Sequence, residues 1–503
     1  MWSAHDSAVG PGVKYGELPS LSGVPRKNIG GKKNKKIMTG RRSSVLSGPK
    51  STAPAASYVG FGLLFLTTLI LLLLLLTDLV SNRFRCCRAW IQLIRPGLLP
   101  NTVSQPDIMF KDLLSTAGVT ALVLPGQTAA TLLYATTYLD TITTLSLKGS
   151  SLQAIASTPG CGANSSWLTP DYANNRIFCL DEGLTSPNGT LSSFGLTSNG
   201  TLSQLDIVDT LSGPVSGVIY GESSNGLALA HYSGSSVAAF DISDASTLAP
   251  VQAETYTLSG PGPNPDRQDA PHPHEALLDP TGQYLLVPDL GADLIRLYSV
   301  DEGELSFTEL EPLAVVPGSG PRHGAFLVTE DGTTYFYLAS ELANTITGFE
   351  VTYNDDATLD FTEVYLSSTH GLNETVPNNT TSAAEILVSP DNKFLLVSSR
   401  GEGTLKIPNF DPTNSTEIAS DPIFTFEIDH SSGKLTRVQQ FPAGGSFPRQ
   451  FSINADGSLV AVGLQNDGRV VVIGRDVETG LLTDFVAAAD VGGQPTSVIF
   501  AAE

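Results

Sequence analysis

Hydrophobic and polar residues recur along most of the chain in one pattern: a short apolar run, a turn rich in Asp, Asn and Gly, and a second apolar run. Runs of this length bounded by turn residues are typical of β-strands. Weaker copies of the pattern lie at 165–181 and 216–232. The four clearest copies lie at 273–289, 324–340, 383–399 and 449–465.

A seventh copy is divided between two distant segments: 131–147 supplies its later strands and 495–503 supplies its first. Seven all-β repeats about 45–65 residues apart predict a seven-bladed β-propeller, because one four-stranded blade cannot bury both of its faces alone. We therefore expect an all-β domain over 131–503 that the divided blade closes into a ring. The inner strands would then begin around one mouth, where function should be sought.

A different pattern precedes this domain. The run YVGFGLLFLTTLILLLLLL (58–76) is long enough to cross about 30 Å of hydrocarbon. We predict a single transmembrane helix at 58–80, with a disordered basic tail over 1–57 and a juxtamembrane connector over 81–130. Ten Lys and Arg residues precede the run and few follow it closely. This positive-inside bias places the tail in the cytosol and the propeller outside.

A second targeting signal lies within the connector. Residues 109–130, from Met109, combine a short charged start, an apolar core and a small-residue end, as a secretory signal peptide does. Two alternatives follow: a propeller anchored in the membrane through residues 58–80, or a secreted propeller if translation starts at Met109. Both place it on the extracytoplasmic side.

Sequons and cysteines favour the same side. The seven N-glycosylation sequons all lie in the propeller, at Asn164, Asn188, Asn199, Asn373, Asn378, Asn379 and Asn414. N-glycans are therefore expected partners. Cys161 and Cys179 have a spacing suited to one disulfide across the first blade junction.

Charge is divided sharply along the chain. Residues 1–111 hold 15 Lys and Arg against 4 Asp and Glu, whereas the remainder holds 13 against 46. A body this acidic repels nucleic acid, which we exclude as a partner of the propeller. The few cations it contains are therefore informative.

Several of these cations fall at loop-to-strand junctions that would converge on one mouth. They occur in APHPHEALLDP (270–280), GSGPRHGAF (318–326), SSRGEG (398–403) and SFPRQF (446–451). A small anionic substrate would be attracted there, since the Arg fork binds carboxylate or phosphate. Each residue also has a structural alternative, because such arginines often bond backbone carbonyls between blades. No metal or cofactor signature is present in these segments.

With these junctions located, the chain resembles the lactonase family of seven-bladed propellers, which includes 6-phosphogluconolactonase and carboxy-cis,cis-muconate cyclase. The resemblance covers about 131–503 and rests on PHPHEALLDPTGQYLLVPDLGAD, PGSGPRH, SEL, SPDNKFLLVSSRG, FPRQFSINADGSLVAV and GQPTSVIF. It implies a catalytic set of His272, His274, Arg322, Glu341 and Arg400. We add His323, Glu385 and Arg449 as substrate-binding candidates. The chain has Ser340-Glu341-Leu342 and Ser399-Arg400 where the family commonly has N-E-L and S-N-R.

The resemblance implies an enzyme that opens or forms a lactone on a small carboxylated substrate without a metal. His272, His274 or Glu341 would move the proton, while Arg322 and Arg400 would hold the substrate and stabilise the oxyanion. The alternative is a cell-surface glycoprotein that uses the propeller as a binding scaffold without catalysis. The two differ in one expectation, because only an enzyme has a reason to gather these charges at one mouth.

Overall fold

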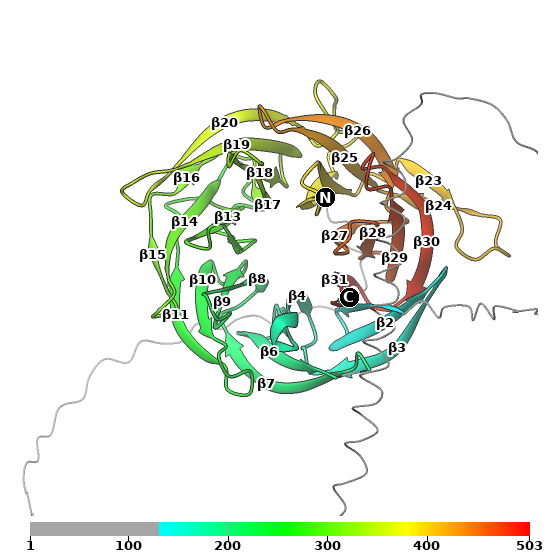
Figure 1. Ribbon diagram of the computed structural model, residues 1–503, viewed down its shortest axis with the longest axis horizontal. Coiled ribbons are helices and arrows are strands. Elements are labelled where there is room, and N and C mark those ends of the chain that lie inside the picture. The colour runs from blue at the N-terminus through cyan, green and yellow to red at the C-terminus, as the bar shows by residue number, and fades with distance from the viewer. Residues whose placement is uncertain (1–129, 198, 503) are drawn as a thin grey trace, which may run out of the picture. The chain divides into compact units, whose positions relative to one another are not determined.

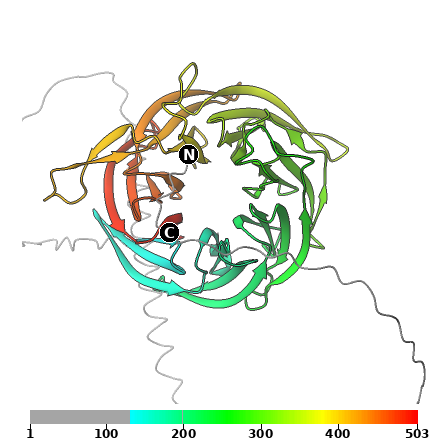
Figure 2. The same ribbon diagram turned by 180° about the vertical axis from the view of Figure 1, so that it is seen from behind.

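The computed structural model describes residues 130–197 and 199–502 and shows seven antiparallel β-sheets arranged as a ring of blades (Figure 1). Figure 2 shows the same ring from behind. The predicted all-β, seven-bladed β-propeller is confirmed. The predicted segments 1–57, 58–80 and 81–129 lie outside the described residues. Among those described, no helix is long and apolar enough to cross a membrane.

Three blades contain the N-terminal part of the propeller, and each runs from an inner strand near the axis to an outer strand at the rim (Figure 1). From inside to outside they are β31 (Pro495–Phe500), β1 (Thr131–Thr137), β2 (Thr141–Lys148) and β3 (Ser151–Pro159); β4 (Ser165–Asp171), β5 (Arg176–Asp181), β6 (Gly189–Leu196) and β7 (Leu202–Thr210); and β8 (Pro214–Tyr220), β9 (Gly226–His231), β10 (Ser236–Asp241) and β11 (Ala249–Thr255). A short 3-10 helix, η1 (Tyr172–Asn174), joins β4 to β5.

Four further blades complete the ring. They are β12 (Leu277–Leu278), β13 (Tyr284–Asp289), β14 (Leu294–Asp301) and β15 (Ser306–Glu309), with β16 (Leu313–Ala314) also paired to β14; β17 (Pro321–Val328), β18 (Thr334–Ser340), β19 (Thr345–Tyr353) and β20 (Leu359–Ser368); β21 (Ser382–Val388), β22 (Phe394–Arg400), β25 (Pro422–Asp429) and β26 (Lys434–Pro442); and β27 (Pro448–Ile453), β28 (Leu459–Leu464), β29 (Arg469–Arg475) and β30 (Leu482–Asp490).

The divided blade closes the ring as the repeat predicts. Strand β31 pairs antiparallel with β1, and Leu133 lies opposite Phe500. Val498 in β31 is fully buried and belongs to an apolar cluster that also includes Val470 of β29. Strand β31 therefore joins the first blade through hydrogen bonds to β1 and the last blade through packing against β29.

One repeat differs from its expected form. The copy at 273–289 has the clearest sequence, yet its inner strand β12 contains only Leu277 and Leu278, preceded by an isolated bridge between Pro273 and Asp289. Prolines lack the N–H that a regular ladder needs. Asp289 instead accepts a hydrogen bond from the His272 backbone N–H at 2.6 Å. Backbone bonds from His274 N–H to the Pro288 carbonyl at 2.9 Å and from Leu290 N–H to the His272 carbonyl at 3.0 Å also hold the segment, in place of a continuous ladder.

The inner strands share a second irregularity, which matters for the site. In six blades the pairing between the inner strand and its neighbour shifts register at the mouth end of the inner strand. Arg322, Glu385 and Arg449 are among the residues left without a ladder partner. A β-bulge of this kind re-aims side chains beside an active site or a rim.

Two features lie outside the repeat. Strands β23 (Leu405–Pro408) and β24 (Glu417–Ser420) form a separate hairpin that projects from the outer side of the ring (Figure 1). Cys161 and Cys179 form a disulfide whose Cα atoms are 5.6 Å apart. This bond ties the segment between β3 and β4 to β5.

Candidate active site

Arg322, Glu341 and Arg400 lie at the same end of their blades. Arg322 is the second residue of β17, Glu341 directly follows β18, and Arg400 is the last residue of β22. In an antiparallel pair, the start of one strand lies beside the end of its neighbour, as Pro321 and Ser340 do. Side chains from distant parts of the sequence therefore meet at one mouth.

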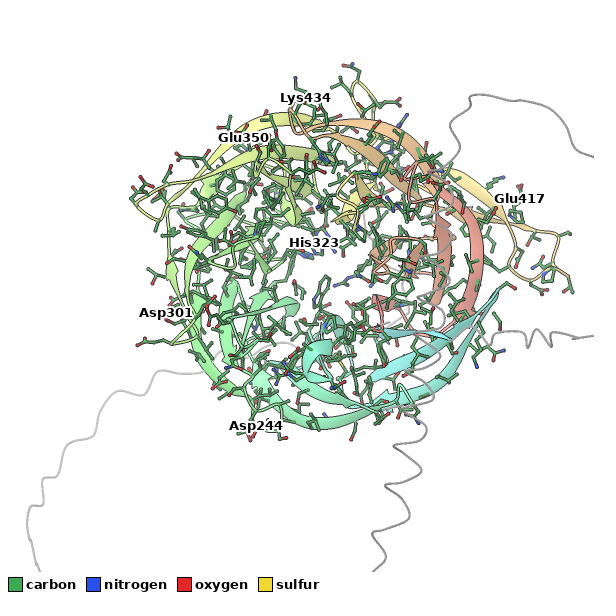
Figure 3. All side chains as sticks on the ribbon, viewed as in Figure 1. Asp244, Asp301, His323, Glu350, Glu417 and Lys434 are labelled. Carbon is green, nitrogen blue, oxygen red and sulfur yellow. A yellow bond between two sulfur atoms is a disulfide. The ribbon has the colours of Figure 1, made fainter. Side chains whose placement is uncertain are left out.

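Figure 3 shows the side chains of the described residues on the ring. His323 lies on the inner side of the ring, toward its central opening, while Asp244, Glu350 and Lys434 lie at the outer rim. The outer charges are solvated in the ordinary way. The inner ones need partners, because buried charges are costly unless they are paired.

Glu341 is the centre of a buried ion cluster. Its Oε2 lies 2.7 Å from Nη1 of Arg322 and 3.0 Å from Nη2 of Arg400, and its Oε1 lies 2.6 Å from Nη2 of Arg267. Arg322, Arg400 and Glu341 are buried, whereas the Arg267 side chain is 34% exposed. Three guanidinium groups thus contact one carboxylate, and solvent reaches the cluster at Arg267.

The partners of Glu341 determine its charge. Burial opposes ionisation, but Arg400, Arg322 and Arg267 together hold the pKa of Glu341 well below the usual glutamate value. Burial, and then the nearby Arg400, lower the pKa of Arg322 to about 9, so its guanidinium is still protonated at neutral pH. Glu341 is therefore a fixed negative charge whose two oxygens are both occupied. It is not a free general base.

The cluster also contains donors without acceptors. Among the described residues, Nε of Arg322 and Nε of Arg400 are buried and have no hydrogen-bond partner. A buried donor left unsatisfied costs about 1–3 kcal/mol. An anionic ligand that accepted hydrogen bonds from these two groups would remove that cost.

A chain of two imidazoles leads away from Arg322. Nη1 of Arg322 hydrogen-bonds Nε2 of His274, and Nδ1 of His274 lies 3.2 Å from Nε2 of His323. Nδ1 of His323 lies 3.0 Å from Oε1 of Glu385. Burial, and then Arg322, lower the pKa of His274 well below that of an ordinary histidine, and burial also lowers the pKa of His323. Both rings are therefore neutral at pH 7.

Two of the predicted residues border this cluster but make no direct contact with Glu341. The His272 ring stacks on Tyr232 with centroids 4.1 Å apart, and its Nε2 lies 3.1 Å from Asp269. Of the two histidines in the P-H-P-H segment, it is His274 that bonds Arg322. Arg449 lies at the corresponding end of its blade but pairs with Glu182 at 3.1 Å and with the Tyr138 hydroxyl at 2.9 Å.

The structure adds residues that the sequence analysis did not single out. Tyr138, Glu182 and Tyr232 each directly follow the second strand of a blade, which is the position of Glu341 in its own blade. Aligning the repeats at that position would have found them. Arg267 has no such equivalent, because it belongs to the long segment between β11 and β12.

One group of side chains in the described part of the chain has a composition suited to a metal ion. Ligand atoms of Glu275, His323 and Glu385 all lie within 4.8 Å of one another. The ring nitrogen that faces the two carboxylates is Nδ1 of His323. This nitrogen can bind a cation only if it carries no proton.

The fold and the cluster together define a propeller with a buried, arginine-rich mouth. The chain belongs to the lactonase family of seven-bladed β-propellers, since the family model described as "Lactonase, 7-bladed beta-propeller" matches residues 132–500. The resemblance noted in the sequence is thereby confirmed.

Several proteins of known name are similar to this chain. A probable 6-phosphogluconolactonase of Arthroderma benhamiae is 34% identical over 319 residues, which cover 63% of this chain and 75% of that protein. The 6-phosphogluconolactonase of Bacillus subtilis is 31% identical over 255 residues, covering 50% of this chain and 64% of that one. The solved periplasmic gluconolactonase of Pseudomonas aeruginosa is 26% identical with a TM-score of 0.63, and the match covers 74% of this chain and 99% of that one. These names support a lactonase, which is a hydrolase.

Proposed function

We propose that this protein hydrolyses a small lactone that carries a negative charge, at the cluster of Arg322, Glu341 and Arg400. The observation that carries the proposal is the meeting of three guanidinium groups on one buried carboxylate. Direct pairing leaves two positive charges without an anion. A substrate carboxylate or phosphate would complete the cluster, since Arg binds both groups with paired donors.

The same donors suit the chemistry of ring opening. Attack of water on a lactone carbonyl places negative charge on the carbonyl oxygen, and preorganised donors stabilise that charge. The free Nε–H groups of Arg322 and Arg400 would supply such donors. When Arg322 turns its hydrogen bond to the substrate, Nε2 of His274 is released to accept a proton from water. The alkoxide that leaves on ring opening takes that proton back.

Ring closure of the muconate cyclase type would use the same residues in the reverse sense. We assign ring opening because the named relatives are lactonases. The scaffold alternative is less well supported, since binding to a partner gives no reason to gather four ionised groups, three of them buried, at one mouth. Their convergence favours an enzyme.

We further propose that the propeller works outside the cytoplasm. The disulfide is consistent with an oxidising compartment. Six of the seven sequon asparagines are exposed, and Asn164 is partly buried with its side chain accepting from the Leu184 backbone N–H at 3.2 Å. The solved relative from Pseudomonas is named as periplasmic. Treatment with an endoglycosidase should lower the apparent mass of protein isolated from a eukaryotic host, and an unchanged mass would reject this location.

The function is tested by acid release from lactones. Full-length protein is assayed in a pH-stat against sugar lactones with and without a carboxylate or phosphate, with EDTA present because we propose a metal-independent reaction. Arg322→Lys keeps the charge but loses the fork, and should lower kcat/KM by about 10²–10³-fold. Arg469→Lys is the matched control, because Arg469 pairs with the exposed Asp490 on the outer strands. Absence of turnover in the wild type, or equal activity in both variants, would reject the proposal.

A further inference from the structure

We propose that His274, His323 and Glu385 form a hydrogen-bonded relay, in which His323 and Glu385 fix the position of the proton on His274 and take up the charge that His274 acquires. The kinetic part of this inference rests on the proposed lactone hydrolysis, whereas the position of the protons does not. His323 and Glu385 act here as positioning residues, because they reach the substrate only through His274.

The direction of the hydrogen bonds follows from the first donor. A guanidinium group has five N–H donors and no acceptor, so Nε2 of His274 must accept the bond from Arg322. A neutral His274 then carries its proton on Nδ1 and donates to Nε2 of His323, 3.2 Å away. His323 in turn carries its proton on Nδ1 and donates to Oε1 of Glu385, 3.0 Å away. One fixed donor thus sets both tautomers.

The far end of the relay is held through one oxygen of Glu385, while its Oε2 is buried without a hydrogen-bond partner among the described residues. Oε1 of Glu385 also accepts from the Ile386 backbone N–H at 3.2 Å. The indole ring of Trp167 packs edge-on against His323, with centroids 5.8 Å apart. Glu385 is one of the residues that the bulge at the start of β21 leaves without a ladder partner. The bulge therefore brings this carboxylate to the imidazole.

The surrounding charges are consistent with a single anionic carboxylate at this end. The ionisable groups that contact the two histidines or act on them through their charge are Arg322, Arg400, Glu341, Arg449, Glu275, Glu385 and Tyr232. Two carboxylates this close do not both ionise readily. Burial, and then Glu385, raise the pKa of Glu275 well above the usual value, which favours its protonated form. Oε2 of Glu275 accepts a hydrogen bond from the Gly324 backbone N–H at 2.6 Å, as a neutral carboxyl can.

In the proton-transfer step, each bond that breaks is matched by a bond that forms. An O–H bond of water breaks and an N–H bond forms at Nε2 of His274, while the hydroxide adds to the lactone carbonyl. The proton on Nδ1 of His274 passes to Nε2 of His323, and the proton on Nδ1 of His323 passes to Oε1 of Glu385. The sequence reverses when the lactone C–O bond breaks and the alkoxide accepts a proton from Nε2 of His274. No oxidant, reductant or metal takes part.

The same hydrogen-bond direction bears on the possible metal group. A cation held by Glu275, His323 and Glu385 would need a free lone pair on Nδ1 of His323, and in the relay this atom carries the proton. Metal binding would turn both imidazoles over and set an N–H of His274 against the guanidinium of Arg322. We therefore assign this group to proton transfer.

The proton positions are tested without any reaction. Full-length protein labelled with ¹⁵N-histidine is examined by NMR, with His323→Asn and His274→Asn used to assign signals. The relay predicts a proton on Nδ1 and a bare Nε2 for both residues at neutral pH. A proton on Nε2 of His323, or Zn²⁺ bound stoichiometrically and lost in Glu385→Gln, would overturn the relay.

The kinetic consequence is tested by pH profiles. Glu385→Gln keeps the shape but removes the charge, so kcat should fall by about 10²–10⁴-fold with little change in KM, by analogy with loss of the acid in a Ser-His-Asp triad. The acid limb of the profile should move to lower pH, because the histidine pair loses the carboxylate that stabilises its protonated form. Glu275→Gln is the control: it resembles the protonated carboxyl and should leave the limb in place. An unmoved limb in Glu385→Gln would reject the relay, whereas no turnover in the wild type would reject the lactonase and leave the NMR result to decide the relay.

Discussion

Glu341 and His274 both carry groups that can accept a proton, yet their partners give them different properties. Glu341 meets three arginines and stays ionised. His274 has one nitrogen against Arg322 and the other against His323, and stays neutral. The sequence places both residues at the mouth but does not show these contacts. Their roles follow from partner chemistry rather than from residue type.

Another buried histidine, outside the site, allows the electrostatic reasoning to be checked separately. Burial lowers the pKa of His231, at the end of β9, to about 4. A folded-state pKa below the unfolded value of about 6.5 gives stability that is present above pH 6.5 and lost as the pH falls toward 4. The wild-type free energy of unfolding should fall between those pH values. We predict that in His231→Leu this fall is smaller by about 3 kcal/mol. Denaturant unfolding of both proteins across this range measures it, and parallel stability curves would contradict it.

At the scale of elements, the β-bulge explains how a repeated fold carries a non-repeated site. The shift at the start of the inner strands occurs in six blades, but in three of them the unpaired residues include Arg322, Glu385 or Arg449. In each of these blades the bulge therefore directs one side chain toward the mouth. The residue type at that position, which differs from blade to blade, determines the chemistry. Core residues can remain repetitive while the mouth does not.

The segment between β11 and β12 is the element that departs most from the repeat. Gln268 is fully buried and donates to the Leu290 carbonyl at 3.0 Å, which anchors the segment to its blade. The neighbouring Arg267 then reaches Glu341 at 2.6 Å. The segment thus contributes a partly exposed cation at the edge of the buried cluster.

We predict that Arg267→Ala raises KM about tenfold and lowers kcat less, because one charge-assisted hydrogen bond to the substrate is lost at the entrance. Steady-state kinetics with an anionic lactone measures both constants. Asp266→Ala is the control, since Asp266 is exposed and adjacent. A fall in kcat with KM unchanged would show that Arg267 does not act in binding.

Repeat spacing and strand patterning were sufficient to predict the blades, the closing strand and the placement of His274, Arg322 and Arg400 at one mouth, whereas Glu341 was added through the family resemblance. They could not predict Arg267, because an insert has no repeat partner from which to infer its position. The shortening of the inner strand β12 was not predicted. The apolar pattern predicts a strand from side chains alone, whereas the ladder also needs backbone N–H groups, which Pro271 and Pro273 lack. The different environments of His272 and His274 depend on side-chain direction, which spacing alone does not give.

At the scale of the whole molecule, the ring brings residues far apart in the sequence to one place. Figure 3 shows Asp244, Asp301, Glu350 and Glu417 at the outer rim, whereas Arg322 and Arg400 are buried at the mouth. An acidic body would repel an anionic substrate over most of its surface. The mouth is therefore where such a substrate can be held.

Closure of the ring is required for this arrangement. We predict that deleting residues 495–503 destabilises the protein by more than about 5 kcal/mol, because Val498, Ile499 and Phe500 are buried and each contributes about 1.5–3 kcal/mol. Thermal or denaturant unfolding measures the loss. Removal of residues 502–503 alone is the control and should change little. A shortened protein that unfolds like the full one would contradict closure by β31.

The central claim is that the arginine-rich mouth hydrolyses an anionic lactone. The most direct test compares kcat/KM for two lactones with the same ring, one bearing a carboxylate or phosphate and one bearing a hydroxyl, at two salt concentrations. We predict that the charged lactone is preferred by at least about tenfold, that Arg400→Lys reduces the preference, and that added salt weakens it. Equal turnover of the two lactones, or turnover of neither, would contradict the account.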